Sequence, residues 1–322
     1  MNAPTDLVDL AQRFDADRRH LRSVALHLLG SAADADDAVQ SAWLKASRSD
    51  VDSIKNIANL TGWFTTITAH EALDQLRARA RRAEEPLADD EELDRLAASA
   101  PADEDALLAD SVSRALLVVL DRLSPAQRVA FVLHDVFAMP FENIADLLDR
   151  SPVAAKKLAS RARGRLHAGP AVEPSGAAEH REIVEAFLDA SRGGDIATLL
   201  RLLAPEVVRR VDAALVPDDV PTELRGARQV AEETRRFAGR ARAGVVMLID
   251  GVSAVVIAPR GRAQIMLRIG VGADRRIHTI DITGGADRLR RAVLTLPRWP
   301  FPPDPQDHPV PRTWDMAGGA TG

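Results

Sequence analysis

Apolar and polar positions divide the chain into a helical first half and a second part that mixes helices with strands. Up to about residue 167, apolar residues recur every three or four positions, the period of an amphipathic helix. Ser124-Pro125 and Ser151-Pro152 each place a capping oxygen before a proline that suits a first helical turn. The block Leu120–Leu166 is therefore predicted to form two helices, a tight turn at Asp149-Arg150 and a third helix.

The first 83 residues are also predicted to be helical. One helix ends at Gly30, a residue type suited to C-caps, and the next begins at the N-cap Ser31. A polar loop at about residues 50–59 precedes a helix from about Thr61 to Arg82. We therefore expect an all-α domain here.

From about residue 179 the period changes. Two helices are separated by Gly193-Gly194, and Asp195 caps the second. Strand-like runs rich in β-branched residues follow at Val207–Val211, Val245–Asp250, Ser253–Ala258, Ala263–Ile269 and Arg276–Ile282. This order predicts an α+β domain with a curved antiparallel sheet.

Composition adds boundaries between these parts. An acidic linker and a Gly-, Pro- and Ala-rich linker separate the predicted domains, and a Pro-rich tail ends the chain. The expected division is 1–83, the acidic linker 84–105, 106–167, the linker 168–178, 179–296 and the tail 297–322.

Composition also excludes several classes of protein. The 322 residues include no cysteine, which excludes disulfides and thiolate metal sites. The first residues lack the basic start and apolar core of a signal peptide, and no apolar run approaches the roughly 20 residues of a membrane helix. We therefore predict a cytoplasmic protein with no membrane partner, no metal and no cofactor.

The net charge of −5 hides strongly charged blocks. Ten acids and one base fall between Glu84 and Asp105, directly after an arginine cluster. The last helix of the Leu120–Leu166 block carries Lys156, Lys157, Arg161, Arg163 and Arg165. Its apolar positions, expected to face inward, are Val153, Leu158, Ala162 and Leu166. A basic helix after a tight turn is typical of a DNA-binding helix-turn-helix, although a small bundle with a solvated basic face gives the same pattern.

Three segments together resemble sigma factors of the sigma-70 family. Phe14–Lys45 resembles their first conserved regions, and Asn59–Ile67 with the arginine-rich helix ending at Arg82 resembles their promoter-melting, −10-reading part. Leu120–Leu166 resembles their −35-reading domain. Two such domains joined by a short linker are the layout of the extracytoplasmic-function (ECF) class. The resemblance implies core RNA polymerase and promoter DNA as partners.

The resemblance also assigns residues to polymerase binding and to the −10 element. For polymerase it implies Asp34, Asp37, Gln40 and Trp43, although the acids equally suit a helix N-terminus and Trp43 equally suits a core. For the −10 element it implies Asn56 and Asn59 as base readers, and Arg77, Arg79, Arg81 and Arg82 as phosphate contacts. The arginines could also form a solvated face.

For the −35 element, the helix after Pro152 would enter the major groove. Lys156, Lys157 and Ser160 would reach base edges, while Arg161, Arg163 and Arg165 would contact phosphates. The small residues Ala154 and Ala155 would admit thymine methyl groups.

The part from residue 179 resembles the cone-shaped SnoaL-type α+β domain, most clearly at its end, HTIDITGGADRLRR. Val211–Asp219 and Gly285–Arg288 depart from the glycine-rich and Asn-Pro-Asp-Lys-like segments common in sigma factors with this extension. Candidate pocket residues are Asp212, Gln264, Arg268, His278 and Asp281. His278 and Asp281 lie three apart, so on one strand they point to opposite faces.

These observations predict an alternative sigma factor that directs promoter-specific transcription initiation and is regulated in cis by its SnoaL-like domain, with a small molecule as a candidate ligand. The chain itself is not expected to be an enzyme. Two alternatives stay open at this point. One is a ligand-responsive DNA-binding regulator that does not act as a sigma subunit. The other is a fusion protein whose C-terminal domain is an enzyme.

Overall fold

The computed structural model describes residues 7–50, 54, 57–82, 111–166, 176–216 and 221–296. The chain forms two compact units. The first holds the N-terminal helices and residues 121–165, and the second holds residues 111–120 and 166–296. Asn56 lies outside the described residues, as do most of both linkers and the Pro-rich tail. The domain boundaries given above stay a prediction.

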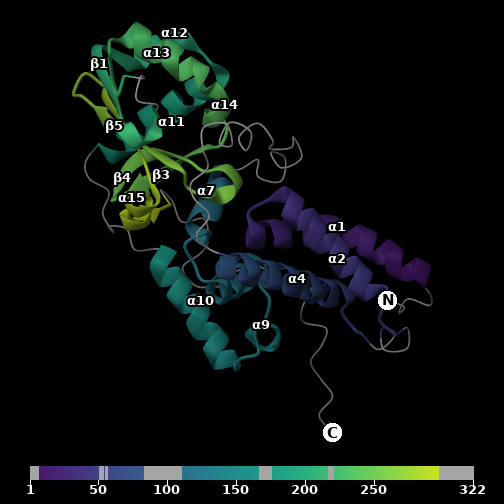
Figure 1. Cartoon of the computed structure of the whole chain (residues 1–322). Helices are drawn as coiled ribbons and strands as arrows, with labels where there is room; N and C mark the ends of the chain where they lie inside the picture. The colour runs from purple at the N-terminus through teal and green to yellow at the C-terminus, as the bar shows by residue number, and fades with distance from the viewer. Residues whose placement is uncertain are drawn as a thin grey trace. The chain divides into compact units, whose positions relative to one another are not determined.

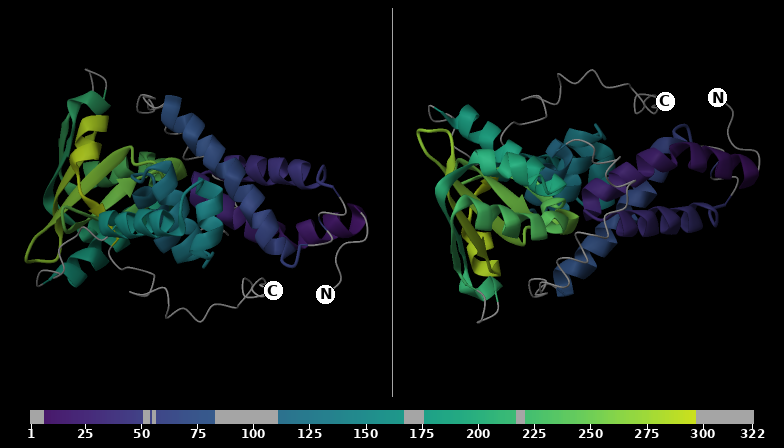
Figure 2. Two further views of the ribbon diagram at one scale, coloured as in Figure 1. Left: turned by 90° about the horizontal axis from the view of Figure 1, so that it is seen from below. Right: turned by 90° about the horizontal axis from the view of Figure 1, so that it is seen from above.

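The N-terminal part of the first unit is a packed set of three helices, α1 (Leu7–Leu29), α2 (Ala32–Ala46) and α4 (Leu60–Arg82) (Figure 2). Phe14 lies at its centre, with its ring centroid 5.0 Å from Phe64 and 5.2 Å from Trp43. Gly30 has a φ of 75°, and the Ser31 hydroxyl accepts a hydrogen bond from the Asp34 amide. Local capping chemistry therefore sets the α1–α2 corner where the sequence predicts it.

The second part of this unit has the predicted helix-turn-helix elements, α8 (Pro125–Phe131), α9 (Phe141–Leu148) and α10 (Pro152–Leu166). Ser124 and Gln127 form a reciprocal capping box, and Asp149 has a φ of 53° in the tight turn. One detail differs from the expectation. The helix from Ser124 continues beyond α8 as a π-helical turn, η1 (Val132–Val136), rather than as α-helix.

The second unit contains a mixed seven-stranded sheet in the order β2-β1-β6-β5-β4-β3-β7 (Figure 1). The strands are β1 (Leu203–Val211), β2 (Glu223–Arg225), β3 (Gly244–Ile249), β4 (Val252–Ile257), β5 (Ile265–Val271), β6 (Ile277–Gly284) and β7 (Leu294–Thr295). The five predicted strands lie within one to four residues of β1 and β3–β6. The expected α+β class is confirmed, but the sheet is not wholly antiparallel, because β1 and β6 run parallel.

Helices cover this sheet. The predicted pair is α11 (Ala177–Gly193) and α12 (Ile196–Leu202), and Asp195 caps α12 as expected. Sequence reasoning missed α13 (Ala227–Arg236), α14 (Ala238–Ala241) and α15 (Ala286–Arg291), and the short turns η2 (Ala213–Leu215) and η3 (Pro259–Gly261). Buried apolar side chains of α11–α14 and the sheet form one core.

Helix α7 (Ser111–Leu120) belongs to this second unit and packs against β3 and η3. Its side chains from Ala115 to Leu120 are all buried. Arg114 Nη1 donates a hydrogen bond to the carbonyl oxygen of Arg242 at 2.8 Å. The backbone at Gly261 approaches α7 so closely that a Cβ there would lie 2.7 Å from Leu117 Cβ.

Candidate functional site

The exposed face of α10 is the candidate DNA-reading surface. Lys156, Lys157, Ser160 and Arg161 are all exposed on it. Val153 was expected to face inward, but it is 64% exposed, because the helix's inner stripe instead runs through Ala155, Ala159 and Ala162. Ala155 is fully buried and cannot meet a thymine methyl group, whereas Val153 presents its own apolar surface there.

Two of the arginines proposed as phosphate contacts make contacts within the helix-turn-helix. Arg163 Nε lies 3.4 Å from Asp135 Oδ1, and Arg165 Nη1 donates to Gln127 Oε1 at 2.9 Å. Asp135 is 6% exposed, and this burial raises its pKa to about 6 even though Arg163 acts in the opposite direction. These contacts position α10 against α8 and η1.

Asn59 has a structural task at the start of α4. Its side-chain oxygen accepts a hydrogen bond from the Gly62 amide at 2.8 Å, and its carbonyl accepts from Trp63. This oxygen therefore caps the helix rather than pointing to a base. The other predicted base reader, Asn56, lies outside the described part of the chain.

The arginines of α4 differ in their surroundings. Arg77 and Arg81 are exposed, and Arg77 pairs with Asp74 at 3.6 Å. Arg79 donates to the Leu29 carbonyl at 3.0 Å and pairs with Asp34 at 2.5 Å. Arg79 and Asp34, proposed for two different partners, thus bind each other. The side chain of Arg82 is outside the described set.

Some, but not all, of the residues predicted to bind polymerase lie on the exposed face of helix α2. Asp37 and Gln40 are exposed, while Trp43 is half-buried against Phe14. Leu44, which sequence reasoning did not single out, is 46% exposed. Its spacing of seven from Asp37 places it on the same helical face, and that spacing is the signal that could have found it.

A buried arginine joins the two helical parts of the first unit. Arg128 is 5% exposed, and its Nε and Nη2 donate to the carbonyl oxygen of His27 at 3.3 and 3.2 Å. Burial lowers its pKa to about 10. Nearby, the Phe137 ring lies 5.6 Å from the His20 ring and 5.5 Å from the His27 ring. Arg128 and His27 lie 101 residues apart in the sequence, so no local sequence pattern predicts their contact.

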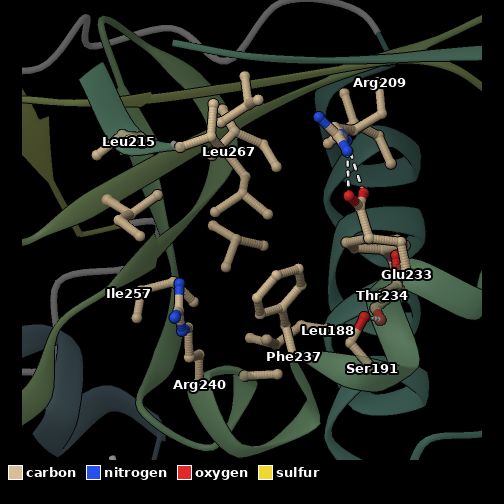
Figure 3. A pocket seen from close by; sticks show the side chains of 18 residues that line it. Leu188, Ser191, Arg209, Leu215, Glu233, Thr234, Phe237, Arg240, Ile257 and Leu267 are labelled. Atoms are coloured by element: carbon tan, nitrogen blue, oxygen red, sulfur yellow. Dashed lines mark hydrogen bonds and ion pairs between the residues drawn. The ribbon is translucent and has the colours of Figure 1, made fainter. Parts of the chain in front are cut away.

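The C-terminal unit contains a cavity of about 150 Å³ (Figure 3). Most of its 18 lining residues are apolar, and the ionisable ones are Arg209, Glu233 and Arg240. Arg209 and Glu233 form a two-pronged ion pair on one side of the space. The hydroxyl groups of Ser191 and Thr234 donate to the main-chain oxygens of Phe187 and Val230.

None of the five pocket residues proposed from the sequence lines this cavity. Four have side-chain partners elsewhere. Asp212 pairs with Arg288, Arg268 with Asp250 and Asp281 with Arg210, and His278 Nε2 lies 2.9 Å from Asp274 Oδ1. The fifth, Gln264, is 9% exposed and lies just before β5. Strand alternation identifies a face, but the face that is covered depends on α13 and α14, which the sequence reading missed.

Within the described residues, no group of three or more acidic, histidine or cysteine side chains could hold a metal ion. In the same part of the chain, no helix is both long and apolar enough to cross a membrane.

Known proteins match the chain at both helical parts and beyond. The sigma-70 region 2 family matches residues 14–82, and the sigma-70 region 4 family matches residues 113–166. Over 226 residues the chain is 40% identical to the ECF RNA polymerase sigma factor SigJ of Mycobacterium tuberculosis, covering 67% of this chain and 68% of that protein.

Solved structures are also similar. The crystal structure of the Mycobacterium tuberculosis extracytoplasmic function sigma factor SigJ is 31% identical, with coverage of 87% of this chain and 98% of that one and a TM-score of 0.40. A SnoaL-like protein of Burkholderia thailandensis is 20% identical, with coverage of 34% and 96% and a TM-score of 0.27.

Proposed function

This chain belongs to the ECF RNA polymerase sigma factors of the sigma-70 family, and from that membership we propose that its C-terminal domain regulates it in cis by holding helix α7. As an alternative sigma factor, the protein joins core RNA polymerase and directs promoter-specific transcription initiation. The alternative of a DNA-binding regulator that is not a sigma subunit is thereby set aside.

The position of α7 carries the proposal. The region 4 match begins at residue 113, so α7 belongs by sequence to the −35-reading domain. In the structure its apolar residues are buried in the C-terminal unit, against β3 and η3. A DNA-reading helical domain needs its own helices packed together, and this form therefore corresponds to a restrained state.

Gly261 offers a sharp test of this restraint. A Cβ there would lie 2.7 Å from Leu117 Cβ, so Gly261→Ala should push α7 away from η3. Its φ of +72° adds local strain, and Gly285, with a φ of +89° and open space around a Cβ, provides the matched control. We expect Gly261→Ala to raise run-off transcription by core polymerase from a −35-dependent promoter severalfold, and Gly285→Ala to behave like the unmodified protein.

Unchanged or reduced transcription by Gly261→Ala would contradict the restraint, provided that hydrogen exchange shows α7 released. Binding to core polymerase, measured in the same preparations, separates an effect on polymerase binding from an effect on transcription initiation. A restraint on α7 predicts that polymerase affinity, which depends on the N-terminal helices, stays the same.

We further propose that the C-terminal domain binds a small molecule rather than transforming one. Its cavity is lined mainly by apolar side chains, and the carboxylate in the described lining, Glu233, is already engaged by Arg209. A general base needs a carboxylate free to take a proton from the substrate. Detection of turnover that is lost in Glu233→Gln would contradict this. Because sigma factors work on RNA polymerase, the site of action that we propose is the cytoplasm.

A further inference from the structure

The cavity of the C-terminal domain combines an apolar wall with one buried and incompletely bonded arginine (Figure 3). Phe187, Val255 and Ile280 are among the apolar lining residues. A space of about 150 Å³ is large enough to admit a molecule the size of benzene, so probes of that order of size are suitable.

Arg209 supplies the polar end of the cavity. It is 3% exposed, its Nε donates to Glu233 Oε2 at 2.7 Å, and its Nη2 bonds Oε1 of the same carboxylate. The remaining nitrogen, Nη1, is buried and has no hydrogen-bond partner among the residues that the structure describes. A buried donor without an acceptor destabilises the fold, so a ligand oxygen placed there would recover free energy.

The charges of the lining residues indicate which kind of ligand oxygen can bind Arg209 Nη1. Arg209 and Glu233 neutralise each other, so a ligand carboxylate placed against Nη1 would meet no net positive charge from this pair and would lie close to the Glu233 carboxylate. Arg240 lies across the space from Arg209, with its guanidinium 4.8 Å from the centroid of the Phe237 ring. Phe237 is 43% exposed, so this stacked pair is partly open to solvent.

We propose that this cavity binds a small, mostly apolar, uncharged molecule whose carbonyl or ether oxygen accepts a hydrogen bond from Arg209 Nη1. The inference rests on the proposal above that the domain takes a ligand, and it names the ligand's class. Ser191 and Thr234 already donate their hydroxyl protons to main-chain oxygens, so toward the cavity they offer acceptors only.

Three probes of similar size distinguish the ligand classes: acetophenone, ethylbenzene and benzoate. Calorimetric titration of the full chain should show acetophenone binding about tenfold more tightly than ethylbenzene, the equivalent of one hydrogen bond of about 1.4 kcal/mol. Benzoate should bind more weakly than either. Equal affinity for acetophenone and ethylbenzene, tightest binding of benzoate, or no binding of any probe would overturn the proposal.

Substitutions test whether Arg209 causes the preference for acetophenone over ethylbenzene. Replacing the whole ion pair, as Arg209→Met with Glu233→Leu, removes the donor without leaving a lone buried charge. This variant should keep ethylbenzene binding and lose the tenfold preference for acetophenone. Arg210→Met is the matched control, because Arg210 neighbours Arg209 on β1 but pairs with Glu223 outside the cavity lining.

A preference that survives in the double variant would exclude Arg209 as the donor. If the double variant binds no probe, Arg209→Lys tests whether Arg209 is the donor. A lysine keeps a positive charge beside Glu233 but lacks a second terminal nitrogen. It should lower the preference severalfold, and an unchanged preference would again overturn the assignment. Binding is measured without polymerase, so its outcome is independent of the transcription test of α7.

Discussion

The carboxyl group of Asp135 lies in the π-helical turn η1, 6% exposed and 3.4 Å from Arg163 of α10. Burial raises its pKa from 3.8 to about 6, so the folded chain holds this proton more tightly than the unfolded chain does. The resulting stabilisation is fully present below about pH 4 and is lost as the pH rises through about 6. Asp135→Asn should not show this loss. The free energy of unfolding of the variant minus that of the unmodified chain should therefore be about 3 kcal/mol larger at pH 7 than at pH 4.

Thermal unfolding at pH 4, 5, 6 and 7 measures this difference. Asp146→Asn, at an exposed position of α9, serves as the control and should leave the pH profile as it is. If the stability of Asp135→Asn depends on pH in the same way as that of the unmodified chain, burial of the ionised Asp135 carboxylate does not lower stability.

Single residues also show which features the sequence could predict. Ser31, Ser124 and Asp195 cap helices where expected, because capping depends on residues within three positions. Arg128 and Arg209 could not be assigned, because the partner of Arg128 lies 101 residues away and that of Arg209 lies on α13, a helix missed by the reading. Local chemistry was predictable, and pairing across the fold was not.

At the scale of elements, α10 separates exposed positions, which we propose meet DNA, from positions that hold the helix in place. Arg161 is exposed, whereas Arg163 contacts the buried Asp135. We propose that Arg161 touches phosphate. Arg161→Ala should weaken binding of −35 DNA about equally across sequences and lower the slope of log affinity against log salt by about 1.

Val153→Ala provides the contrast within the same helix. Its apolar, 64% exposed side chain should affect discrimination at a thymine position while leaving the salt slope unchanged. Fluorescence titrations of the polymerase-bound protein at several salt concentrations measure both quantities. A salt slope that Arg161→Ala leaves intact would rule out its phosphate contact.

Helix α2 presents the candidate polymerase face, formed by Asp37, Gln40 and Leu44. An exposed leucine beside polar residues suits an interface, where it is buried against the partner. Leu44→Ala should weaken core polymerase binding about tenfold, or about 1.4 kcal/mol, without lowering thermal stability. Asp36→Asn is the control, since Asp36 pairs with Arg22 of α1. Unaltered affinity for Leu44→Ala would place the polymerase contact elsewhere.

At the scale of the whole molecule, side-chain and main-chain contacts join regions that lie far apart in sequence. Residues Arg240 and Ala241 line the cavity, and the next residue, Arg242, accepts the hydrogen bond from Arg114 of α7. Ile257, another lining residue, ends β4 just before η3, on which α7 also packs. The cavity wall and the α7 contact are therefore parts of the same segments.

Arg128 performs the corresponding task in the first unit, where it joins the helix-turn-helix to the C-terminal end of α1. Its pKa of about 10 keeps it charged at neutral pH, and a cation bonded to the last carbonyls of a helix is favourable. Arg128→Met keeps the apolar length of the side chain but leaves the His27 oxygen without these donors. We expect a loss of about 2 kcal/mol in the contact between the two helical parts.

Hydrogen exchange of the full chain measures this loss directly. In the unmodified protein, amides of α1 and α4 and those of α8–α10 should open together, whereas in Arg128→Met the helix-turn-helix should lose about 30-fold protection while α1 and α4 keep theirs. Arg161→Met, at an exposed arginine of α10, should change neither set. Equal loss of protection in both sets would mean that Arg128 stabilises the unit as a whole, and that no separable contact links the −10-reading and −35-reading parts.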